Sequence, residues 1–351
     1  MRDACCIYAG RTAMVLRLDF VTLMLRSASL RRVRLASMRL VLVLLLAAVA
    51  HATEPPYAAK SPLPAPVVFA PGVISTGDFE SHPAFTPDGN ALYYLKDAPN
   101  FSFWTIVVSH FQNGQWSQPE VMPWSGQYRD ADPFVTTDGR RMYFISDRPV
   151  DGKPKEDLDI WMLEKQGETW SEPNHLGPPV NSEGNEWFPT EAADGTLYFG
   201  SDRPGGLGKT DLYRCRRTPD GYAAAENLGP NVNSAADEFE PLIDVDQTML
   251  VFMASGRPEG KGSGDLYISR FVNGAWQPAR NLGEPINSRA LEISPKISPD
   301  GRWLFFTSTR GVFVGKPFAA RKSTQEFMST LHGPGNGLGD IYQVDIGALS
   351  P

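Results

Sequence analysis

The chain has 351 residues with 30 Pro, 32 Gly and 11% aromatic residues, a composition typical of short strands joined by many turns. Its formal charge of −7 disfavours nucleic acids and anionic membrane surfaces as partners. No long stretch repeats apolar residues at the helical spacing, so we expect an all-β protein.

Residues 38–52 have the pattern of a secretory signal peptide: a Met-Arg start, an apolar run over 40–50 and a final Ala-His-Ala. The run is too short to span a bilayer. We therefore expect an exported protein, located in the periplasm of a Gram-negative bacterium or secreted, with no integral membrane span in its mature chain. Residues 1–37 fit only as an extended n-region or a non-native upstream extension. Cleavage after residue 52 removes eight Arg and two Asp and changes the charge from −7 to −13.

A unit of roughly 50 to 56 residues recurs five times along the rest of the chain. It contains a Pro, a polar turn built around an Asp, an aromatic strand and a further strand that begins near an Asp. Four short antiparallel strands per unit are typical of a β-propeller blade. The Pro and turn Asp recur as Pro83 and Asp88, Pro133 and Asp138, Pro189 and Asp194, Pro241 and Asp246, and Pro295 and Asp300.

The order of these residues resembles the TolB-type repeat, a WD-like β-propeller family with the pattern P-x-x-S-P-D-G-x-x-L-Y-F-x-S-x-R-P-G-G-x-G-x-x-D-I-Y. "SPDGRWLFFTSTR" from Ser298 and "SDRPGGLGKTDLYR" from Ser201 carry the resemblance, which covers nearly all of the predicted mature chain. It implies a propeller but little about activity, because such proteins serve as binding modules, scaffolds and parts of peptidases. We find no separate α/β domain before the propeller and therefore do not expect the role of TolB itself.

Five units predict five four-stranded blades, and six blades, which the family resemblance favours, are the alternative. The fifth unit stops after its third strand. Residues 63–76 are expected to supply the missing fourth strand, because Pro66 and Ser75 match the fourth-strand Pro and Ser of other units. The predicted organisation is therefore residues 1–37 as an upstream extension, 38–52 as a signal peptide, 53–62 as a Pro-rich linker and 63–351 as the propeller.

Charged residues also recur with the repeat. Each unit has a carboxylate three residues before its Pro, and because first strands line a propeller channel, we expect these acids to form a ring at one mouth. We interpret the ring as structural, with Arg side chains that bridge two carboxylates, brace the blades and lower the pKa of every acid; a cation or polar-ligand site is the alternative. The ring is Glu80, Asp130, Glu186, Glu238 and Glu292, and the bracing residues are Arg148, Arg203, Arg257 and Arg310 with Asp159, Asp211, Asp265 and Asp340.

Two departures from the repeat indicate a candidate ligand site. The first unit has Lys96 and Asp97 where the Arg is expected, and the fifth unit has an insertion of about twenty residues before its third strand. Ring closure makes these units neighbours, so we expect a site at the seam between blades 5 and 1, with the insertion either a lid or an inert loop. The candidate ligand-binding residues are Glu80, His82, Lys96, Asp97, Glu292, Lys316, Arg321, Lys322 and His332.

Catalytic signatures are absent from the sequence. There is no G-x-S-x-G nucleophile elbow and no H-E-x-x-H zinc motif, so we predict no catalytic residues, no metal site and no cofactor, although the ring leaves room for a divalent cation. We predict a non-catalytic exported propeller that binds a protein, a polar small molecule or a glycan through its channel face. The alternative is a glycan-acting hydrolase or lyase that uses channel-mouth carboxylates, and whether the protein is an enzyme stays open.

Overall fold

The computed structural model describes residues 54–59, 62–313 and 317–349. The predicted segments 1–37 and 38–52 and the candidate residue Lys316 lie outside the described residues. Within these described ranges, no helix is both long and apolar enough to cross a membrane. All the strands described below belong to one compact unit that starts at Pro55.

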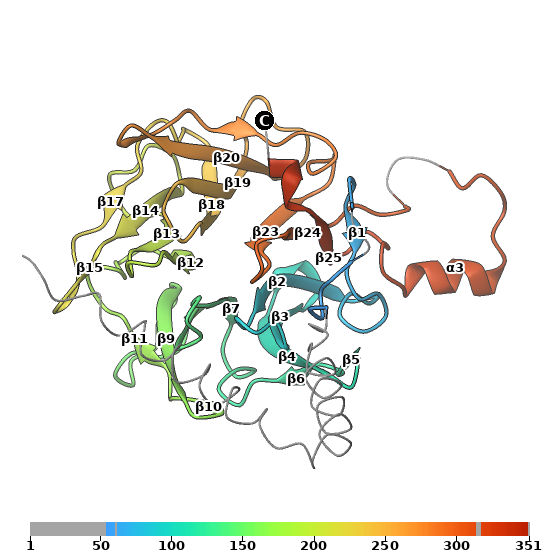
Figure 1. Ribbon diagram of the computed structural model, residues 1–351, viewed down its shortest axis with the longest axis horizontal. Coiled ribbons are helices and arrows are strands. Elements are labelled where there is room, and N and C mark those ends of the chain that lie inside the picture. Colours follow the sequence, from blue (N-terminus) through green and yellow to red (C-terminus); the bar gives the residue numbers. More distant parts are fainter. Residues whose placement is uncertain (1–53, 60–61, 314–316, 350–351) are drawn as a thin grey trace, which may run out of the picture. The chain divides into compact units, whose positions relative to one another are not determined.

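Five antiparallel sheets, the blades, stand around a common centre (Figure 1). Blade 1 consists of β2 (Phe79–Phe85), β3 (Ala91–Asp97), β4 (Trp104–Gln112), β5 (Gln115–Trp116) and β6 (Glu120–Val121). Blade 2 consists of β7 (Asp130–Val135), β8 (Arg141–Ser146), β9 (Asp159–Gln166), β10 (Thr169–Trp170) and β11 (Asn174–His175). Blade 3 consists of β12 (Glu186–Glu191), β13 (Leu197–Ser201), β14 (Asp211–Cys215) and β17 (Glu226–Asn227), with a small hairpin of β15 (Arg217–Thr218) and β16 (Gly221–Tyr222).

Blades 4 and 5 complete the ring. Blade 4 consists of β18 (Asp237–Ile243), β19 (Met249–Ser255), β20 (Asp265–Val272), β21 (Ala275–Trp276) and β22 (Arg280–Asn281). Blade 5 consists of β23 (Glu292–Ile297), β24 (Trp303–Ser308), β25 (Asp340–Asp345) and β1 (Val67–Val68). The prediction of a five-bladed all-β propeller is therefore confirmed.

The N-terminal strand closes the ring as predicted. Val67 and Val68 of β1 pair with Gln343 and Tyr342 of β25, which satisfies the backbone edge of the third strand. The predicted register is wrong in one detail. Thr76, rather than Ser75, takes the place of the fourth-strand Ser, because its backbone N–H and hydroxyl both donate to Glu80. Ser75, the residue before Thr76, instead forms hydrogen bonds with the backbone N–H and carbonyl of Ile341.

Aromatic side chains of the second strands form the core. Tyr94, Phe144, Phe199, Phe252 and Phe306 are fully buried at equivalent positions of the five blades. Rings of this size bury a large apolar area, so their stacking between sheets is a major source of stability.

Each innermost strand contains the same bulge. Two residues, the second of which is the recurring Pro, stand opposite one residue of the second strand. A Pro is tolerated there because it has no N–H to donate to the ladder. The residue before the Pro has a positive φ of 53–58° in all five blades, a conformation that costs a non-Gly residue about 1–2 kcal/mol. These residues are His82, Asp132, Phe188, Glu240 and Ser294.

The insertion of blade 5 contains a helix that we did not predict, α3 (Thr324–Leu331). None of its residues is buried, and it projects away from the blades (Figure 1). Ser323 and Glu326 form a capping box at its start, in which each side chain binds the backbone N–H of the other residue. The sequence signal for this helix was therefore present in the spacing S-x-x-E.

Candidate functional site

The five predicted ring acids do not line the channel. All five are fully buried, and none contributes to either of the two channel pockets described below. Glu186, Glu238 and Glu292 each accept hydrogen bonds from the backbone N–H and hydroxyl of the Ser four residues earlier. The side chains of these acids therefore point into the junction with the preceding blade. The expected ring of acids at the channel mouth is wrong.

The predicted bracing residues are arranged differently from the expected lattice. Each ring acid except Glu80 binds the Arg of its own blade, at nitrogen to oxygen distances of 2.6–3.2 Å. The four Arg are Arg148, Arg203, Arg257 and Arg310. The pKa of Asp130 and of Glu186 is nevertheless raised, because burial outweighs the hydrogen bonds and the charge of the Arg. The expectation that the Arg lowers every pKa is wrong.

The third-strand acids make no ion pair with these Arg within the described part of the chain. Asp211, Asp265 and Asp340 instead accept hydrogen bonds from backbone N–H groups of the loop that precedes them. Asp159 binds Lys155 at 2.5 Å and His175 at 2.9 Å. The third-strand acids therefore hold loops in place and do not share an Arg guanidinium with the ring acids.

The seam between blades 5 and 1 holds a polar pocket of 450 Å³. Lys96 and His332 line it, together with Asp78. Lys96 takes the place of the missing Arg, because its ammonium lies 2.5 Å from Glu80 and 3.0 Å from Asp78. His332 packs so closely on Gly77 that its backbone leaves no room for a Cβ there.

The other seam candidates lie elsewhere. Glu292 is held by Ser288 and Arg310 inside the ring junction. Arg321 and Lys322 are exposed on the projecting insertion, and Lys322 lies over the ring of Phe318. His82 and Asp97 face the channel rather than the seam. Of the eight candidates that the structure describes, it therefore brings together Glu80, Lys96 and His332 at the seam.

The channel is closed near its middle by side chains from the bulges. His82 Nε2 lies 3.2 Å from Asp132 Oδ1 and 3.3 Å from Glu240 Oε1. The second oxygen of Asp132 accepts the Phe188 N–H at 3.0 Å, and that of Glu240 accepts the Ser294 N–H. The five residues before the Pro thus bind one another, and the left-handed backbone at each bulge is what places them there.

Electrostatics favour the protonated form of His82. Burial alone would lower its pKa, but the carboxylates of Asp132 and Glu240 raise it overall. Its other nitrogen, Nδ1, lies 2.8 Å from the Ser81 oxygen, whose hydroxyl donates to Asp97 at 2.7 Å. Burial raises the pKa of Asp132 to about 7, against the opposing charge of His82.

One pocket, of 290 Å³, opens on the face that carries the connections between second and third strands; we call it the loop-face pocket. His82, Asp97, Asp132 and Glu240 contribute its polar groups. Its walls are aromatic and aliphatic, and the aromatic residues are Phe101, Trp104, Trp187, Phe188 and Phe239. The volume suits a ligand about the size of one ring.

Asp97, which lines this pocket, has one carboxylate oxygen without a hydrogen-bond partner among the described residues. Its Oδ2 accepts the Ser81 hydroxyl, whereas Oδ1 is buried and has no hydrogen-bond partner among the described residues. Burial raises the pKa of Asp97 to about 6, although His82 and Ser81 oppose the shift. A buried acceptor without a donor is costly, so a ligand that donates to it gains that free energy.

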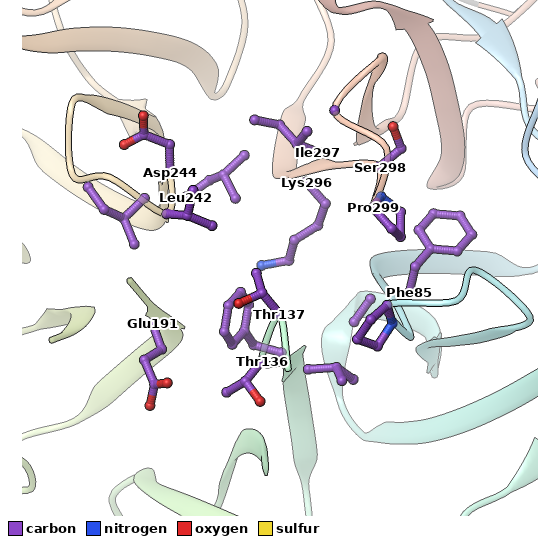
Figure 2. A pocket seen from close by; sticks show the side chains of 17 residues that line it. Phe85, Thr136, Thr137, Glu191, Leu242, Asp244, Lys296, Ile297, Ser298 and Pro299 are labelled. Carbon is purple, nitrogen blue, oxygen red and sulfur yellow. The ribbon is translucent and has the colours of Figure 1, made fainter. Parts of the chain in front are cut away.

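The other pocket, of 390 Å³, opens on the opposite face, which carries the turns between first and second strands; we call it the turn-face pocket. Lys296 reaches into it from β23 (Figure 2). Burial lowers the pKa of Lys296 to about 8, although Asp132 and Glu240 oppose the shift.

No metal centre is evident in the part of the chain that the structure describes, since no three or more His, Cys, Asp or Glu are grouped to hold an ion. His82, Asp132 and Glu240 come close together, but their atoms already bind each other and the backbone.

Sequence reasoning missed Asp132, Phe188, Glu240, Ser294 and Lys296. A signal was present, because the residue before the recurring Pro differs in every unit, whereas the Pro itself and the acid three residues before that Pro recur. The regular alternation of side chains along a strand led us to overlook this position. In a regular strand the ring acid and the residue two positions later share a face, whereas the bulge turns the later residue alone toward the channel.

Comparisons with known proteins agree with the fold. No family model and no curated protein matches the chain. A solved structure named glycoside hydrolase is 10% identical with a TM-score of 0.50, over 81% of this chain and 92% of that chain. An α-L-arabinofuranosidase from Lactobacillus brevis is 11% identical, with a TM-score of 0.42 over 77% and 92% of the two chains. A protein described as a candidate TolB from Agrobacterium tumefaciens is 15% identical, with a TM-score of 0.45 over 76% and 90%. At such identities the likeness shows the propeller fold alone.

Proposed function

We propose that the protein is an exported, TolB-type binding propeller whose loop-face pocket takes a small organic cation with an apolar body. The observation that carries this proposal is the buried, unpartnered Oδ1 of Asp97 in a pocket with aromatic walls, a statement limited to the described residues. An ammonium group supplies the missing donor, and aromatic faces attract cations.

The charge of the pocket supports the same ligand class. Among the described residues, three carboxyl groups line the pocket: Asp97, Asp132 and Glu240. Two cations balance part of this charge, His82 in the pocket and Lys296 from the turn-face side. A bound cation also favours the ionised form of Asp97, whose pKa burial otherwise raises to about 6. Affinity is therefore expected to fall below that pH, because a neutral Asp97 no longer attracts the ligand.

The test uses phenethylamine as the probe and 2-phenylethanol as its neutral counterpart. Trp104 and Trp187 line the pocket, so tryptophan fluorescence reports binding together with calorimetry. We expect the amine to bind at least about tenfold more tightly than the alcohol, which corresponds to one charge-assisted contact. Asp97→Asn should remove this preference, whereas Asp78→Asn, at an exposed carboxylate of the seam, should leave it unchanged. Equal binding of amine and alcohol would refute the proposal.

A second candidate function is glycan hydrolysis. The pKa values of Asp97 and Asp132, about 6 and about 7, lie in the range of general acids, and both residues line one pocket. Asp132 is already engaged, because Oδ1 pairs with His82 and Oδ2 accepts the Phe188 N–H, so Asp97 is the acid on which this candidate depends. A panel of 4-nitrophenyl glycosides tests this second candidate function. Turnover by the wild type that disappears in Asp97→Asn supports hydrolysis, whereas the absence of turnover by the wild type contradicts it.

Export belongs to the same proposal and rests on the signal-peptide pattern of residues 38–52. N-terminal sequencing of the protein from the periplasm or medium should give Thr53 as the first residue. Recovery of a chain that keeps Arg39, or recovery only from the cytosol, would contradict export.

A further inference from the structure

The residue after the bulge Pro serves the opposite mouth of the channel. Ala84, Phe134, Leu242 and Lys296 occupy this position in blades 1, 2, 4 and 5, and all four line the turn-face pocket. The fifth equivalent, Thr190, donates its hydroxyl to the Pro241 carbonyl instead. Lys296 is therefore the one charged side chain that this position directs into the 390 Å³ cavity.

The acids of the turn-face pocket are already engaged. Glu191 accepts from Arg141 at 2.6 Å and from the Tyr143 hydroxyl at 2.5 Å. Asp244 accepts from the backbone and hydroxyl of Thr248 and from the Met249 N–H. Neither carboxylate is left to bind a ligand cation.

Lys296 is in the opposite situation. Its ammonium makes no hydrogen bond or ion pair with any described residue and lies 5.6 Å from the centre of the Phe134 ring. The side chain extends into the cavity (Figure 2). The low pKa of about 8 shows that burial is only partly compensated by Asp132 and Glu240. An anion placed on Lys296 would supply the missing compensation.

The walls define the rest of the ligand. Phe85, Val135, Leu242 and Ile297 surround the lysine with apolar surface. A phosphate would require several donors, whereas one ammonium suits the single charge of a carboxylate. We propose that the turn-face pocket is a second ligand site, which binds a small monocarboxylate with an apolar body through an ion pair to Lys296.

Binding of hexanoate and benzoate, with hexanamide and benzamide as uncharged counterparts, tests this site by calorimetry on the full chain. We expect both carboxylates to bind at least about tenfold more tightly than their amides. Lys296→Met should abolish this preference, and Lys296→Arg should retain most of it because the positive charge is kept. Equal binding of acids and amides by the wild type would overturn the proposal.

Reductive methylation followed by peptide mass spectrometry provides a measurement that requires no variant. Hexanoate should slow the methylation of Lys296, whereas Lys209, whose side chain is 83% exposed, should react equally with and without it. An unchanged methylation rate of Lys296 in saturating hexanoate would also overturn the proposal. Neither experiment depends on the loop-face pocket, so its outcome is independent of the amine proposal.

Discussion

Glu80 keeps a countercharge although its blade lacks the Arg that the other four blades carry. Lys96 reaches the same carboxylate from the second strand, and Glu80 is fully buried. Breaking a buried pair by removal of one partner leaves an uncompensated charge. The departure from the repeat that first marked Lys96 as a candidate ligand residue therefore has a structural role as well.

We expect Lys96→Met to lower the free energy of unfolding by about 3 kcal/mol, because it leaves Glu80 buried without a cation. Lys209→Met is the matched control, because its ion pair with Asp237 is 3.5 Å long and the lysine is 83% exposed; its cost should stay below about 1 kcal/mol. Urea unfolding at neutral pH measures both. Similar losses for the two variants would show that the buried pair contributes nothing special.

The raised pKa of Asp97 predicts a pH dependence of stability. In the unfolded chain the pKa of this carboxyl is near its ordinary value of 3.8, whereas in the folded protein burial raises its pKa to about 6. The folded state therefore binds more protons between these values, and the contribution of Asp97 to stability is fully present below pH 3.8 and is lost as the pH rises through 6.

The shift corresponds to about 3 kcal/mol. We expect Asp97→Asn to become more stable relative to the wild type as the pH is raised from 4 to 7. Denaturation curves of both proteins at several pH values measure the difference. A constant gap between wild type and variant across this range would be inconsistent with the shifted pKa.

At the scale of single residues, the sequence marked Lys96 and Asp97 as departures from the repeat and His82 as a candidate ligand residue, but did not show what they contact. The contacts of His82 with Asp132 and Glu240 join blade 1 to blades 2 and 4. They also depend on a left-handed backbone at a non-Gly residue, for which the sequence gives no rule.

At the scale of elements, the insertion of blade 5 is nearly separate from the propeller core. Phe313, Phe318 and Phe327 pack on each other, and no residue of α3 is buried. No described residue of the insertion lines the loop-face pocket. In the described part of the chain, the insertion therefore does not cover the channel site.

Replacing residues 318–331 by a short Gly-Ser linker should therefore change the free energy of unfolding by less than about 1 kcal/mol. Phenethylamine binding should remain as in the wild type. Calorimetry and thermal unfolding measure the two effects. If binding were lost while the fold survived, the insertion would be part of the site after all, and the seam hypothesis would regain support.

The helix itself could have been found in the sequence from its capping box, Ser323 and Glu326, whereas its position could not. Eight residues with no buried side chain have no apolar face directed at a core, so the usual helical periodicity was too weak to detect. Strands were easier to predict, because each recurs five times with the same turn and aromatic residues.

At the scale of the whole molecule, five repeats and one missing outer strand were sufficient to predict a closed ring. β1 contains only Val67 and Val68, but the pairing is extended by the Phe69 N–H, which donates to Ile341, and by the Asp345 N–H, which donates to Leu63. Beyond that pairing, Ile74 is fully buried, and Thr76 binds the Glu80 carboxylate of blade 1. The N-terminal segment thus joins the last blade to the first.

A chain that starts at Gly77 should therefore aggregate or unfold at a much lower temperature than one that starts at Thr53. The expected loss is global, because each blade of a propeller is stabilised by its neighbours. Light scattering and thermal unfolding compare the two chains. Unchanged unfolding of the shorter chain would show that the ring does not need this segment.

Because of the bulge at each recurring Pro, the residue that faces the channel can vary without a change in the packing of the blade. The five residues there are a histidine, two different acids, a phenylalanine and a serine, yet their φ angles differ by only a few degrees. The backbone alone fixes where the side chain goes, so its chemistry is free to vary. Duplication of a blade therefore adds one backbone position that directs a side chain into the channel, whichever residue stands there. Substitution at this position can change the channel lining one blade at a time. With five such positions, the same fold can carry many combinations of channel-lining side chains.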